Sequence, residues 1–362
     1  MKKKIAIYVP NLRLGGAEKV AMNLANEFNL KGFNVDLLLT NREGVYFRQL
    51  SDQVNVHILS GKRVSLDFFY LLKYLFKYKP NILLGTLTHV NLIVILAKFF
   101  TFTRTKFFIS EHSLISQYNV IEKSKKNNYL VKLLYKNADG IIAVSDEIKK
   151  DILELTNSKL NIKVIPNPVI DIDIDSVIHN ANDHKNSRVN ITDFFLYVGR
   201  LEKEKNILEL VKAITPILNE REEKLLIIGE GTLKEEIRSF ILNKGLDDKI
   251  ILLGYVELPY DYMKNAKLLI LPSLFEGFGN VAIEALYCQT DVIVSSTAIA
   301  TINIIKEGTE VTTFHPEDSD SLRNAIETVL LNPNKIDSSF FDQFTSNNVA
   351  DRYIDYFQNG SR

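Results

Sequence analysis

Short apolar segments alternate with amphipathic segments along most of this 362-residue chain. Residues 4–9 form an apolar run, residues 15–28 place apolar side chains on one face of a helix, and residues 33–40 are apolar again. Parallel strands need long crossover connections, and the helices of those crossovers cover both faces of the sheet. The alternation therefore predicts an α/β fold with doubly wound parallel sheets.

The same pattern predicts further elements in both halves of the chain. In the first half we expect strands at 54–59, 81–84, 105–109, 140–144 and 162–165, and helices at 65–79, 90–100, 121–136 and from 145 onward. In the second half we expect strands at 194–198, 224–228, 250–253, 268–271 and 292–295. Beyond the last strand the pattern fades, so a loop without regular structure is expected before a final helix near 349–357.

Hydrophobic periodicity is lost between the two alternating regions. The sequence Pro166-Asn167-Pro168 and the polar run 180–190 are typical of a linker. We therefore expect a first Rossmann-like domain at 1–166, a linker at 167–193, a second Rossmann-like domain at 194–345 and a terminal segment at 346–362. The length of the chain is sufficient for two domains that each bury a core.

The single cysteine and the first residues indicate the compartment. Cys288 cannot form an internal disulfide, which fits a reducing compartment. The basic residues 2–4 precede only a short apolar run, so we interpret them as the start of a strand and not as a signal peptide. The longest apolar segment, 90–102, is too short to span a bilayer and contains Lys98. A cytoplasmic protein without a transmembrane helix is expected.

Charge is unevenly distributed, although 44 Lys and Arg balance 44 Asp and Glu overall. Residues 1–165 hold 25 of the basic and 13 of the acidic residues, which leaves 19 and 31 for the rest. Cations and aromatic residues interleave at 62–79 and 99–107, and lysines recur at 123–136. Most of these aromatics would face the core, yet basic amphipathic segments also suit an anionic membrane. We expect docking at the cytoplasmic face of the inner membrane; nucleic acid is the rival partner, but no nucleic-acid motif is present.

The segment from Phe275 to Leu286 carries the most chemical information. It follows an apolar run and continues as a helix, with two glycines that permit a sharp turn. Amides at a helix start can bind an anion or sugar hydroxyls, and those concerned here belong to Gly277, Phe278, Gly279 and Asn280. Glu276 and Glu284 bracket the turn. Eight helical positions span about 12 Å, whereas a retaining glycosidase needs its carboxylates about 5–5.5 Å apart, so a hydrolase is disfavoured.

Two cations, Arg200 and Lys205, follow the strand predicted at 194–198. Gly199 turns the chain between that strand and the cations. Arg can hold a diphosphate through two parallel hydrogen bonds, and Lys adds a mobile point charge. Solvated surface cations are the alternative on these residues alone. We select Arg200 and Lys205 as diphosphate ligands.

Both segments resemble motifs of the retaining glycosyltransferases of the GT-B fold, and most closely those of family 4. Residues 275–286 are similar to the signature in which two glutamates are separated by seven residues, and residues 199–206 are similar to the Gly-Arg…Lys-Asn diphosphate clamp. The resemblance covers nearly the whole chain. It implies two domains facing across a cleft, a final helix that crosses back to the first domain, Glu276 at the donor sugar and Glu284 at the ribose.

Two segments of the first half acquire a role through this resemblance. Gly15-Gly16 resembles the N-terminal glycine motif whose amides approach the donor phosphate; a plain helix-entry turn is the alternative. His112 lies in a Ser-Glu-His-Ser loop similar to one in bacterial family 4 enzymes, where the histidine lies by the donor sugar and the acceptor. Without the resemblance, a structural hydrogen-bonding role would be the commoner one.

Three other segments carry weaker signals. Residues 171–175 contain Asp-any-Asp triplets, the metal motif of the GT-A fold, but an exposed linker explains the alternation. We therefore predict no essential metal and no cofactor. Residues 229–232 could line the donor site, although helix capping explains them. Residues 295–303 lack the glycine-rich turn and the glutamate of the family, which places contacts to the diphosphate and sugar in doubt.

The resemblance implies transfer of a hexosyl residue from a nucleotide diphosphate sugar, expected to be a UDP-sugar, with retained anomeric configuration. The implied acceptor is a glycan, expected to be lipid-linked, in the synthesis of capsule, O-antigen or another bacterial surface polysaccharide. Arg200 and Lys205 would stabilise charge on the departing diphosphate, Glu276 would orient the sugar, and His112 would assist. A nucleotide-sugar epimerase of the same fold and a non-catalytic nucleotide-sugar-binding subunit are the alternatives.

Overall fold

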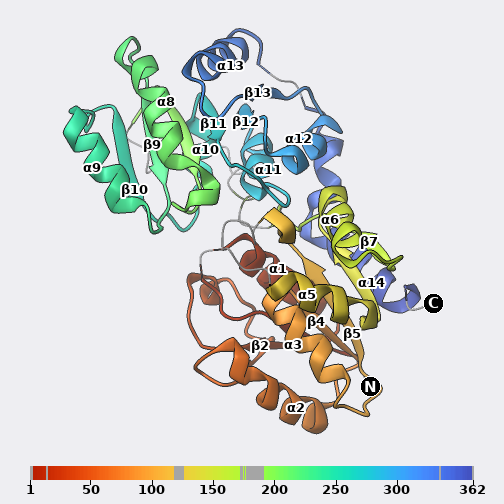
Figure 1. Cartoon of the computed structure of the whole chain (residues 1–362). Helices are drawn as coiled ribbons and strands as arrows, with labels where there is room; N and C mark the ends of the chain where they lie inside the picture. Colours follow the sequence, from red (N-terminus) through yellow and green to blue (C-terminus); the bar gives the residue numbers. More distant parts are fainter. Residues whose placement is uncertain are drawn as a thin grey trace. The chain divides into compact units, whose positions relative to one another are not determined.

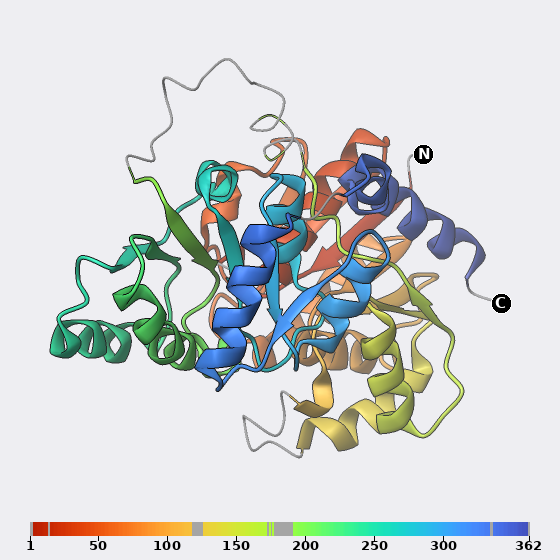
Figure 2. The same cartoon turned by 90° about the horizontal axis from the view of Figure 1, so that it is seen from above.

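The computed structural model describes residues 3–13, 15–117, 126–171, 174, 176, 191–333 and 336–360. The chain divides into two compact units, Met1–Val169 with Gln343–Arg362, and Ile170–Asp342. Each unit is a parallel sheet covered by helices, which confirms the predicted fold class (Figure 1, Figure 2). The division falls inside the segment predicted as linker, 167–193. Most of that segment lies outside the described residues, so its extent stays a prediction.

The first unit contains a seven-stranded sheet in the order β3-β2-β1-β4-β5-β6-β7. Its strands are β1 (Lys4–Tyr8), β2 (Asn34–Leu39), β3 (Asn55–Ile58), β4 (Ile82–Gly85), β5 (Lys106–Glu111), β6 (Gly140–Ala143) and β7 (Ile162–Val164). Its helices are α1 (Gly16–Leu30), α2 (Asp67–Tyr78), α3 (Thr88–Lys98), α5 (Lys126–Leu134), α6 (Asp146–Thr156) and α14 (Ser346–Asn359). The start predicted for α5, at 121, lies outside the described residues.

The last helix of the chain belongs to the core of this first unit. Phe28 of α1 contacts the rings of Tyr353 and Phe357 of α14, with centroid distances of 6.3 and 5.9 Å. Tyr353 and Phe357 are both almost completely buried. Helices α2, α3 and α5 pack in a row on the other face of the sheet. Among the described residues, no helix combines the length and the apolarity needed to cross a membrane.

The second unit contains a six-stranded sheet in the order β10-β9-β8-β11-β12-β13. Its strands are β8 (Phe194–Val198), β9 (Lys224–Ile228), β10 (Ile250–Gly254), β11 (Leu268–Leu271), β12 (Val292–Ser295) and β13 (Thr312–Phe314). Its helices are α8 (Ile207–Asn219), α9 (Lys234–Lys244), α10 (Tyr260–Asn265), α11 (Asn280–Tyr287), α12 (Ile299–Lys306) and α13 (Ser319–Leu331). The chain therefore runs outward from β8 in both directions, first through β9 and β10 and later through β11 to β13.

The expectation of an irregular loop after residue 295 is wrong. This region contains α12, β13 and α13, followed by the 3-10 segment Ser338–Phe344. β13 has only three residues at the sheet edge, which is too short for a periodic signal. The start of α13 could have been predicted from the sequence, because Asp318 is a typical N-cap residue. Its side chain accepts hydrogen bonds from the amides of Asp320 and Ser321.

Candidate active site

The loops after β8 and β11 leave neighbouring strands at the carboxyl edge of the second unit's sheet. β8 and β11 are paired, but the chain continues from β8 to β9 on the opposite side. In open α/β sheets, ligands bind at such a switch point outside the carboxyl ends of the strands. Arg200 and Lys205 follow β8, whereas Glu276 follows β11. The fold thus brings three predicted site residues, distant in sequence, to one place.

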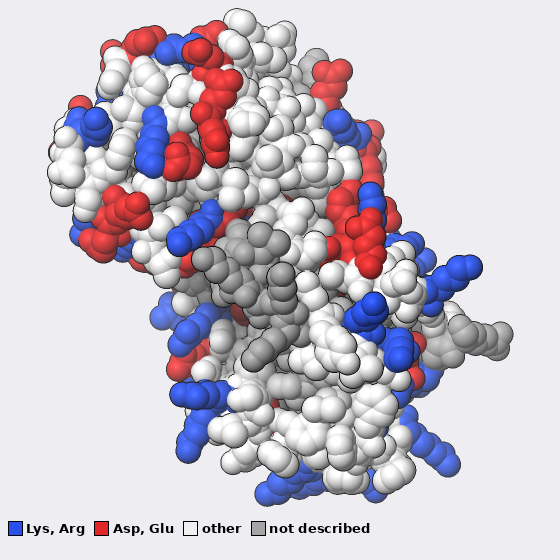
Figure 3. Space-filling view, in the orientation of Figure 1, with Lys and Arg blue, Asp and Glu red and all other residues white. Residues whose placement is uncertain are grey.

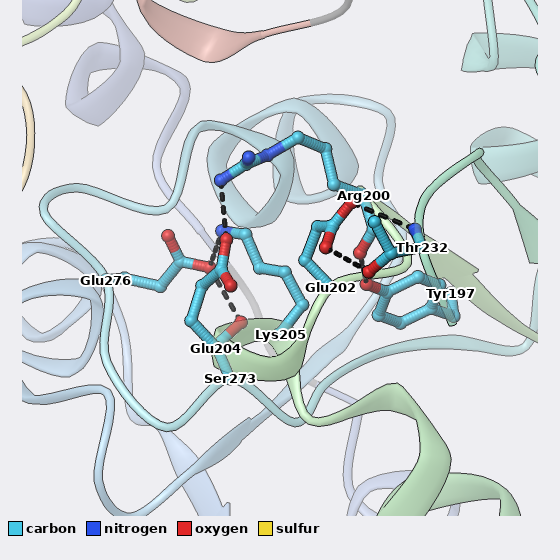
Figure 4. Close-up of polar contacts among 8 residues, drawn as sticks. All are labelled: Tyr197, Arg200, Glu202, Glu204, Lys205, Thr232, Ser273 and Glu276. Carbon is cyan, nitrogen blue, oxygen red and sulfur yellow. Dashed lines mark hydrogen bonds and ion pairs between the residues drawn. The ribbon is translucent and has the colours of Figure 1, made fainter. Parts of the chain in front are cut away.

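The loop after β8 carries both predicted cations within a few residues. Lys203–Lys205 form the 3-10 turn η4, which ends at Asn206 with a φ of 55°. The Arg200 guanidinium donates to Glu204 Oε1 at 2.7 Å, and Lys205 Nζ donates to Glu276 Oε1 at 2.6 Å. Figure 4 shows these four head groups gathered at one place. Both cations are therefore paired with carboxylates of the same unit.

A neighbouring glycine loop holds the Arg200 loop in position. The amide of Gly199 donates to Ile228 O, and the amide of Leu201 donates to Glu230 O, at 3.0 and 2.9 Å. A Cβ on Gly229 would lie 1.9 Å from Gly199 O, and one on Gly231 would lie 2.4 Å from Leu201 O. The two loops can approach this closely only because both positions are glycine.

Polar side chains complete the same support (Figure 4). The carboxylate of Glu202 accepts the amide of Thr232 at 3.0 Å and its hydroxyl at 2.6 Å. The Tyr197 hydroxyl donates to Arg200 O at 2.8 Å. Burial raises the pKa of Tyr197 well above its ordinary value, so the hydroxyl keeps the proton that it donates. The backbone of Arg200 is thus fixed, while its guanidinium stays half-exposed.

Glu276 joins the loop after β11 to the loop after β8. Its Oε1 accepts hydrogen bonds from Lys205 Nζ and from the hydroxyl of Ser273 at 2.7 Å. The amide of Leu274 also donates to Glu204 O at 3.0 Å. Glu276 is only 9% exposed, and Ser273 is fully buried. A buried carboxylate held by a cation and a hydroxyl is a fixed acceptor, suited to orienting ligand hydroxyls.

The turn after Glu276 enters α11 through Gly279, whose φ is 87°. A Cβ on Gly279 would lie 2.3 Å from Thr301 Oγ1. The Thr301 hydroxyl donates to Phe278 O at 3.0 Å, and the Thr297 hydroxyl donates to Ser273 O at 3.1 Å. The segment 295–303, which departs from the family pattern, therefore supports this turn through two threonine hydroxyls. Glu284 lies in α11 and is 8% exposed.

His112 lies in the first unit, directly after β5. Its Nδ1 bonds to Asn167 Oδ1 at 3.1 Å and its Nε2 to Ser110 Oγ at 2.9 Å. Because Oδ1 can only accept, the proton is assigned to Nδ1, and Nε2 accepts from Ser110. Burial lowers the pKa of His112 to about 4, so the ring is neutral at pH 7. Both ring nitrogens are engaged within the first unit.

Comparison with known proteins shows which family the chain is similar to. Residues 14–171 match the family described as Glycosyltransferase Family 4, and residues 180–340 match Glycosyl transferases group 1. A Campylobacter jejuni relative is 31% identical over 311 residues, which cover 80% of each chain. Its name is N-acetylgalactosamine-N,N'-diacetylbacillosaminyl-diphospho-undecaprenol 4-alpha-N-acetylgalactosaminyltransferase. The chain belongs to glycosyltransferase family 4.

One further relative and one solved structure are similar to this family 4 glycosyltransferase. A second Campylobacter jejuni relative, GalNAc-alpha-(1->4)-GalNAc-alpha-(1->3)-diNAcBac-PP-undecaprenol alpha-1,4-N-acetyl-D-galactosaminyltransferase, is 27% identical over 98% of this chain and 94% of its own length. The crystal structure of Anabaena HepE with UDP and glucose superposes with a TM-score of 0.74 at 18% identity, covering 98% of this chain and 95% of that one. At that identity the likeness shows the shared GT-B fold.

The predicted glycine motif of this glycosyltransferase lies at the carboxyl end of β1. Gly15 is the residue before α1 and has an extended backbone, and Gly16 is the first helical residue. A Cβ on Gly15 would meet the Glu18 carboxylate at 1.9 Å. The sequence had therefore located the helix entry correctly, while a contact between these amides and a donor stays a prediction.

Several polar residues of the site escaped the sequence-based selection. Glu202, Glu204, Thr232 and Ser273 anchor or pair the predicted residues. The Gly229/Gly231 pair was the available signal, since glycines after a strand indicate close backbone approach. Across the residues that the structure describes, no three His, Cys, Asp or Glu side chains converge as metal ligands. Of residues 171–175, the positions 172, 173 and 175 lie outside that part.

Proposed function

We propose that this glycosyltransferase moves a hexosyl residue from a UDP-sugar to a lipid-linked glycan acceptor, with retention of the anomeric configuration. The two Campylobacter jejuni relatives are named for N-acetylgalactosamine transfer to undecaprenol-diphosphate glycans. The crystal structure of HepE contains UDP and glucose. These names support a UDP-sugar donor and an acceptor used in bacterial surface glycan synthesis.

The observation that carries the proposal is the pairing of Arg200 and Lys205 with Glu204 and Glu276 at the switch point of the second unit. A diphosphate bound here would displace these carboxylates from the two cations, and its own oxygens would accept the hydrogen bonds of Arg200 and Lys205. The two cations would then stabilise the negative charge that develops as the sugar–phosphate bond breaks. Glu276 and the turn 277–280 would hold the sugar, and Glu284 the ribose.

The reaction balances without an external base or oxidant. The bond between the anomeric carbon and the diphosphate oxygen breaks, and the electron pair leaves with the UDP. The acceptor hydroxyl oxygen forms the new bond on the same face of the sugar, and its proton passes to the departing phosphate oxygen. His112, neutral at pH 7, would bind the sugar or the acceptor through a ring nitrogen released from Asn167 or Ser110.

The test incubates the full chain with labelled UDP-GalNAc, UDP-GlcNAc, UDP-Gal and UDP-Glc in the presence of undecaprenol-linked glycans. A labelled product that extracts into organic solvent, with the donor's anomeric configuration by NMR, is expected for one of these donors. Isomerised donor without acceptor would identify an epimerase, and tight binding without product would identify a binding subunit. Full activity after treatment with EDTA is expected, because the proposed chemistry uses Arg200 and Lys205 in place of a metal.

A further inference from the structure

The exposed aromatic residues of the described chain gather in the first unit. Every exposed Phe or Tyr side chain of the residues with described side chains belongs to α2, to the end of α3 and the segment after it, or to α5. These residues are Phe69, Tyr70, Phe76, Phe99, Phe100, Phe102 and Tyr129. Phe102 is 98% exposed and Phe69 is 70% exposed. Such a concentration of exposed apolar rings marks an interaction surface.

The aromatics of α2 and α3 form one continuous surface. At 100° per residue, positions 66, 69, 70, 73, 76 and 77 fall within an arc of about 120° on α2. The opposite arc holds the buried Leu71, Tyr74 and Leu75. Phe68 connects the two helices, since its ring lies 5.3 Å from Phe69 and 5.5 Å from Phe100. We call the exposed arc of α2 together with residues 99–102 the α2–α3 face.

The part of the sequence that contains this face carries an excess of positive charge. Residues 62–136 contain thirteen Lys and Arg but three Asp and Glu. Of those carboxylates, Asp67 and Glu111 are buried, and residue 122 lies outside the described part. Lys73 and Lys77 lie on the exposed arc itself. Around α2 and α3, in the lower part of Figure 3, the surface is mostly white and blue.

We propose that the α2–α3 face docks this glycosyltransferase onto an anionic lipid bilayer. Apolar rings on an outer helix face can insert among headgroups, while Lys73 and Lys77 extend to the lipid phosphates. Attraction amounts to about fivefold in affinity for each basic residue near an anionic surface. A folded protein partner would need acidic complementarity of its own, and a bilayer supplies acidic charge and an apolar layer together. This inference rests on the proposed function, because docking on a bilayer would bring the enzyme to its lipid-linked acceptor. Binding of the chain to vesicles can nevertheless be measured without transferase activity.

The test is sedimentation of the full chain with vesicles of phosphatidylcholine alone or with one quarter phosphatidylglycerol. Binding is expected only to the anionic vesicles and falls as salt rises. Phe69→Ser/Phe76→Ser/Phe102→Ser should lower the partition coefficient at least tenfold, and Lys73→Glu/Lys77→Glu by about 25-fold or more. The matched controls Leu242→Ser/Leu331→Ser and Lys159→Glu/Lys244→Glu change exposed residues elsewhere and should bind like the parent.

Three results would overturn the proposal. These are absence of binding to anionic vesicles, equal loss of binding in the control variants, and preferential binding of a single-stranded oligonucleotide that the Lys73/Lys77 variant loses. Thermal melts establish that each variant is folded. UDP binding by calorimetry should be the same in all variants. A failure of UDP binding in the parent chain would therefore count against the proposed function, and a failure of vesicle binding only against the docking surface.

Discussion

At the scale of single residues, the candidate site holds its cations in internal ion pairs. Arg200 and Glu204 are four positions apart on one loop, whereas Lys205 and Glu276 come from two loops. A partly exposed ion pair contributes only about 0–1 kcal/mol. Charge-assisted bonds to a diphosphate are stronger, and Arg can make two of them in parallel. The pair of Arg200, whose side chain is about half-exposed, with Glu204 is therefore weak enough for a diphosphate to displace.

The first prediction concerns loss of either cation. Arg200→Ala and Lys205→Ala should each lower kcat/KM by about 10²–10³-fold, as is usual when one oriented electrostatic donor is removed. Arg200→Lys keeps the positive charge but loses the guanidinium that can make two parallel hydrogen bonds. Its kcat/KM should therefore lie between those of Arg200→Ala and the parent. Steady-state transfer assays measure all three, with Lys212→Ala, which breaks a surface pair with Glu209, as control. Parent-like turnover in both Ala variants would rule out the clamp.

The second prediction concerns competition between Glu204 and the diphosphate. Glu204→Gln keeps the shape of the side chain but frees the guanidinium of Arg200 from an ion pair. The Kd for UDP should then decrease by about two- to fivefold, which corresponds to the modest worth of such a pair. Calorimetric titration gives this Kd, and Glu209→Gln is the matched control. Weaker binding in Glu204→Gln would instead show that the carboxylate positions Arg200 for the ligand.

At the scale of elements, the end of β5 holds two adjacent groups with opposite pKa shifts. Burial raises the pKa of Glu111 to about 7, although donors from Tyr135, Asn91 and Thr88 oppose the rise. Burial lowers the pKa of the next residue, His112, to about 4. Both groups are therefore kept uncharged by the same desolvated environment between about pH 4 and 7.

The third prediction follows from the signs of these shifts. The raised pKa of Glu111 contributes stability that is complete below pH 4.5 and is lost as the pH rises to about 7. The lowered pKa of His112 contributes stability that is complete above pH 6.5 and is lost as the pH falls to about 4. In the parent, Glu111 and His112 therefore change the free energy of unfolding with pH in opposite directions. Glu111→Gln should therefore gain about 2 kcal/mol relative to the parent as the pH rises from 5 to 7.

Urea unfolding at pH 5, 6 and 7, followed by probes in the first unit, measures this difference. His112→Asn should change the slope in the opposite direction, because it removes the group that favours higher pH. A constant difference between Glu111→Gln and the parent across this range would contradict the assigned pKa of Glu111.

The fourth prediction concerns the turn that enters α11. Gly279→Ala combines an unfavourable φ of 87° with a Cβ 2.3 Å from Thr301 Oγ1. We expect donor Kd to rise at least tenfold, because the turn must shift. Adding Thr301→Ala removes the nearest steric contact but not the backbone strain, so it should restore binding only in part. Full restoration would mean that the φ of Gly279 does not matter; parent-like binding in Gly279→Ala alone would mean that the turn is not part of the site.

The sequence led us to select Arg200, Lys205 and Glu276, because cations and a carboxylate beside glycines after apolar runs indicate a ligand site. The fold brings these three side chains together, while their contact with a ligand stays a prediction. The sequence did not single out Glu204, Ser273 and Thr301. A glutamate is usually an exposed surface residue, and serine and threonine serve equally in caps and loops. Their role depends on which loops the sheet order brings together. The sequence also did not predict β13, because a strand of three residues is too short to show a hydrophobic periodicity.

At the scale of the whole molecule, the two units are not built from two simple halves of the chain. Residues 343–362 complete the first unit, so its core closes only after the second unit has been synthesised. Tyr353 is fully buried there, contacts Phe28 and hydrogen-bonds with Ser110 Oγ at 3.2 Å. Ser110 in turn donates to His112. The terminal helix therefore stabilises the first unit and supports the histidine.

The last prediction separates these two roles of Tyr353. Tyr353→Ala should destabilise the first unit by about 3–5 kcal/mol, the usual effect of truncating a buried aromatic residue. Tyr353→Phe keeps the ring and removes only the hydrogen bond, so it should cost about 1 kcal/mol. Because a protein of two units need not unfold in one step, hydrogen exchange of β1, β2 and α1 is compared with that of β8 and β11. Protection should fall in the first set only, and UDP binding should be unchanged if the second unit alone holds the nucleotide. Equal loss of protection in both sets would show instead that α14 couples the stability of one unit to that of the other.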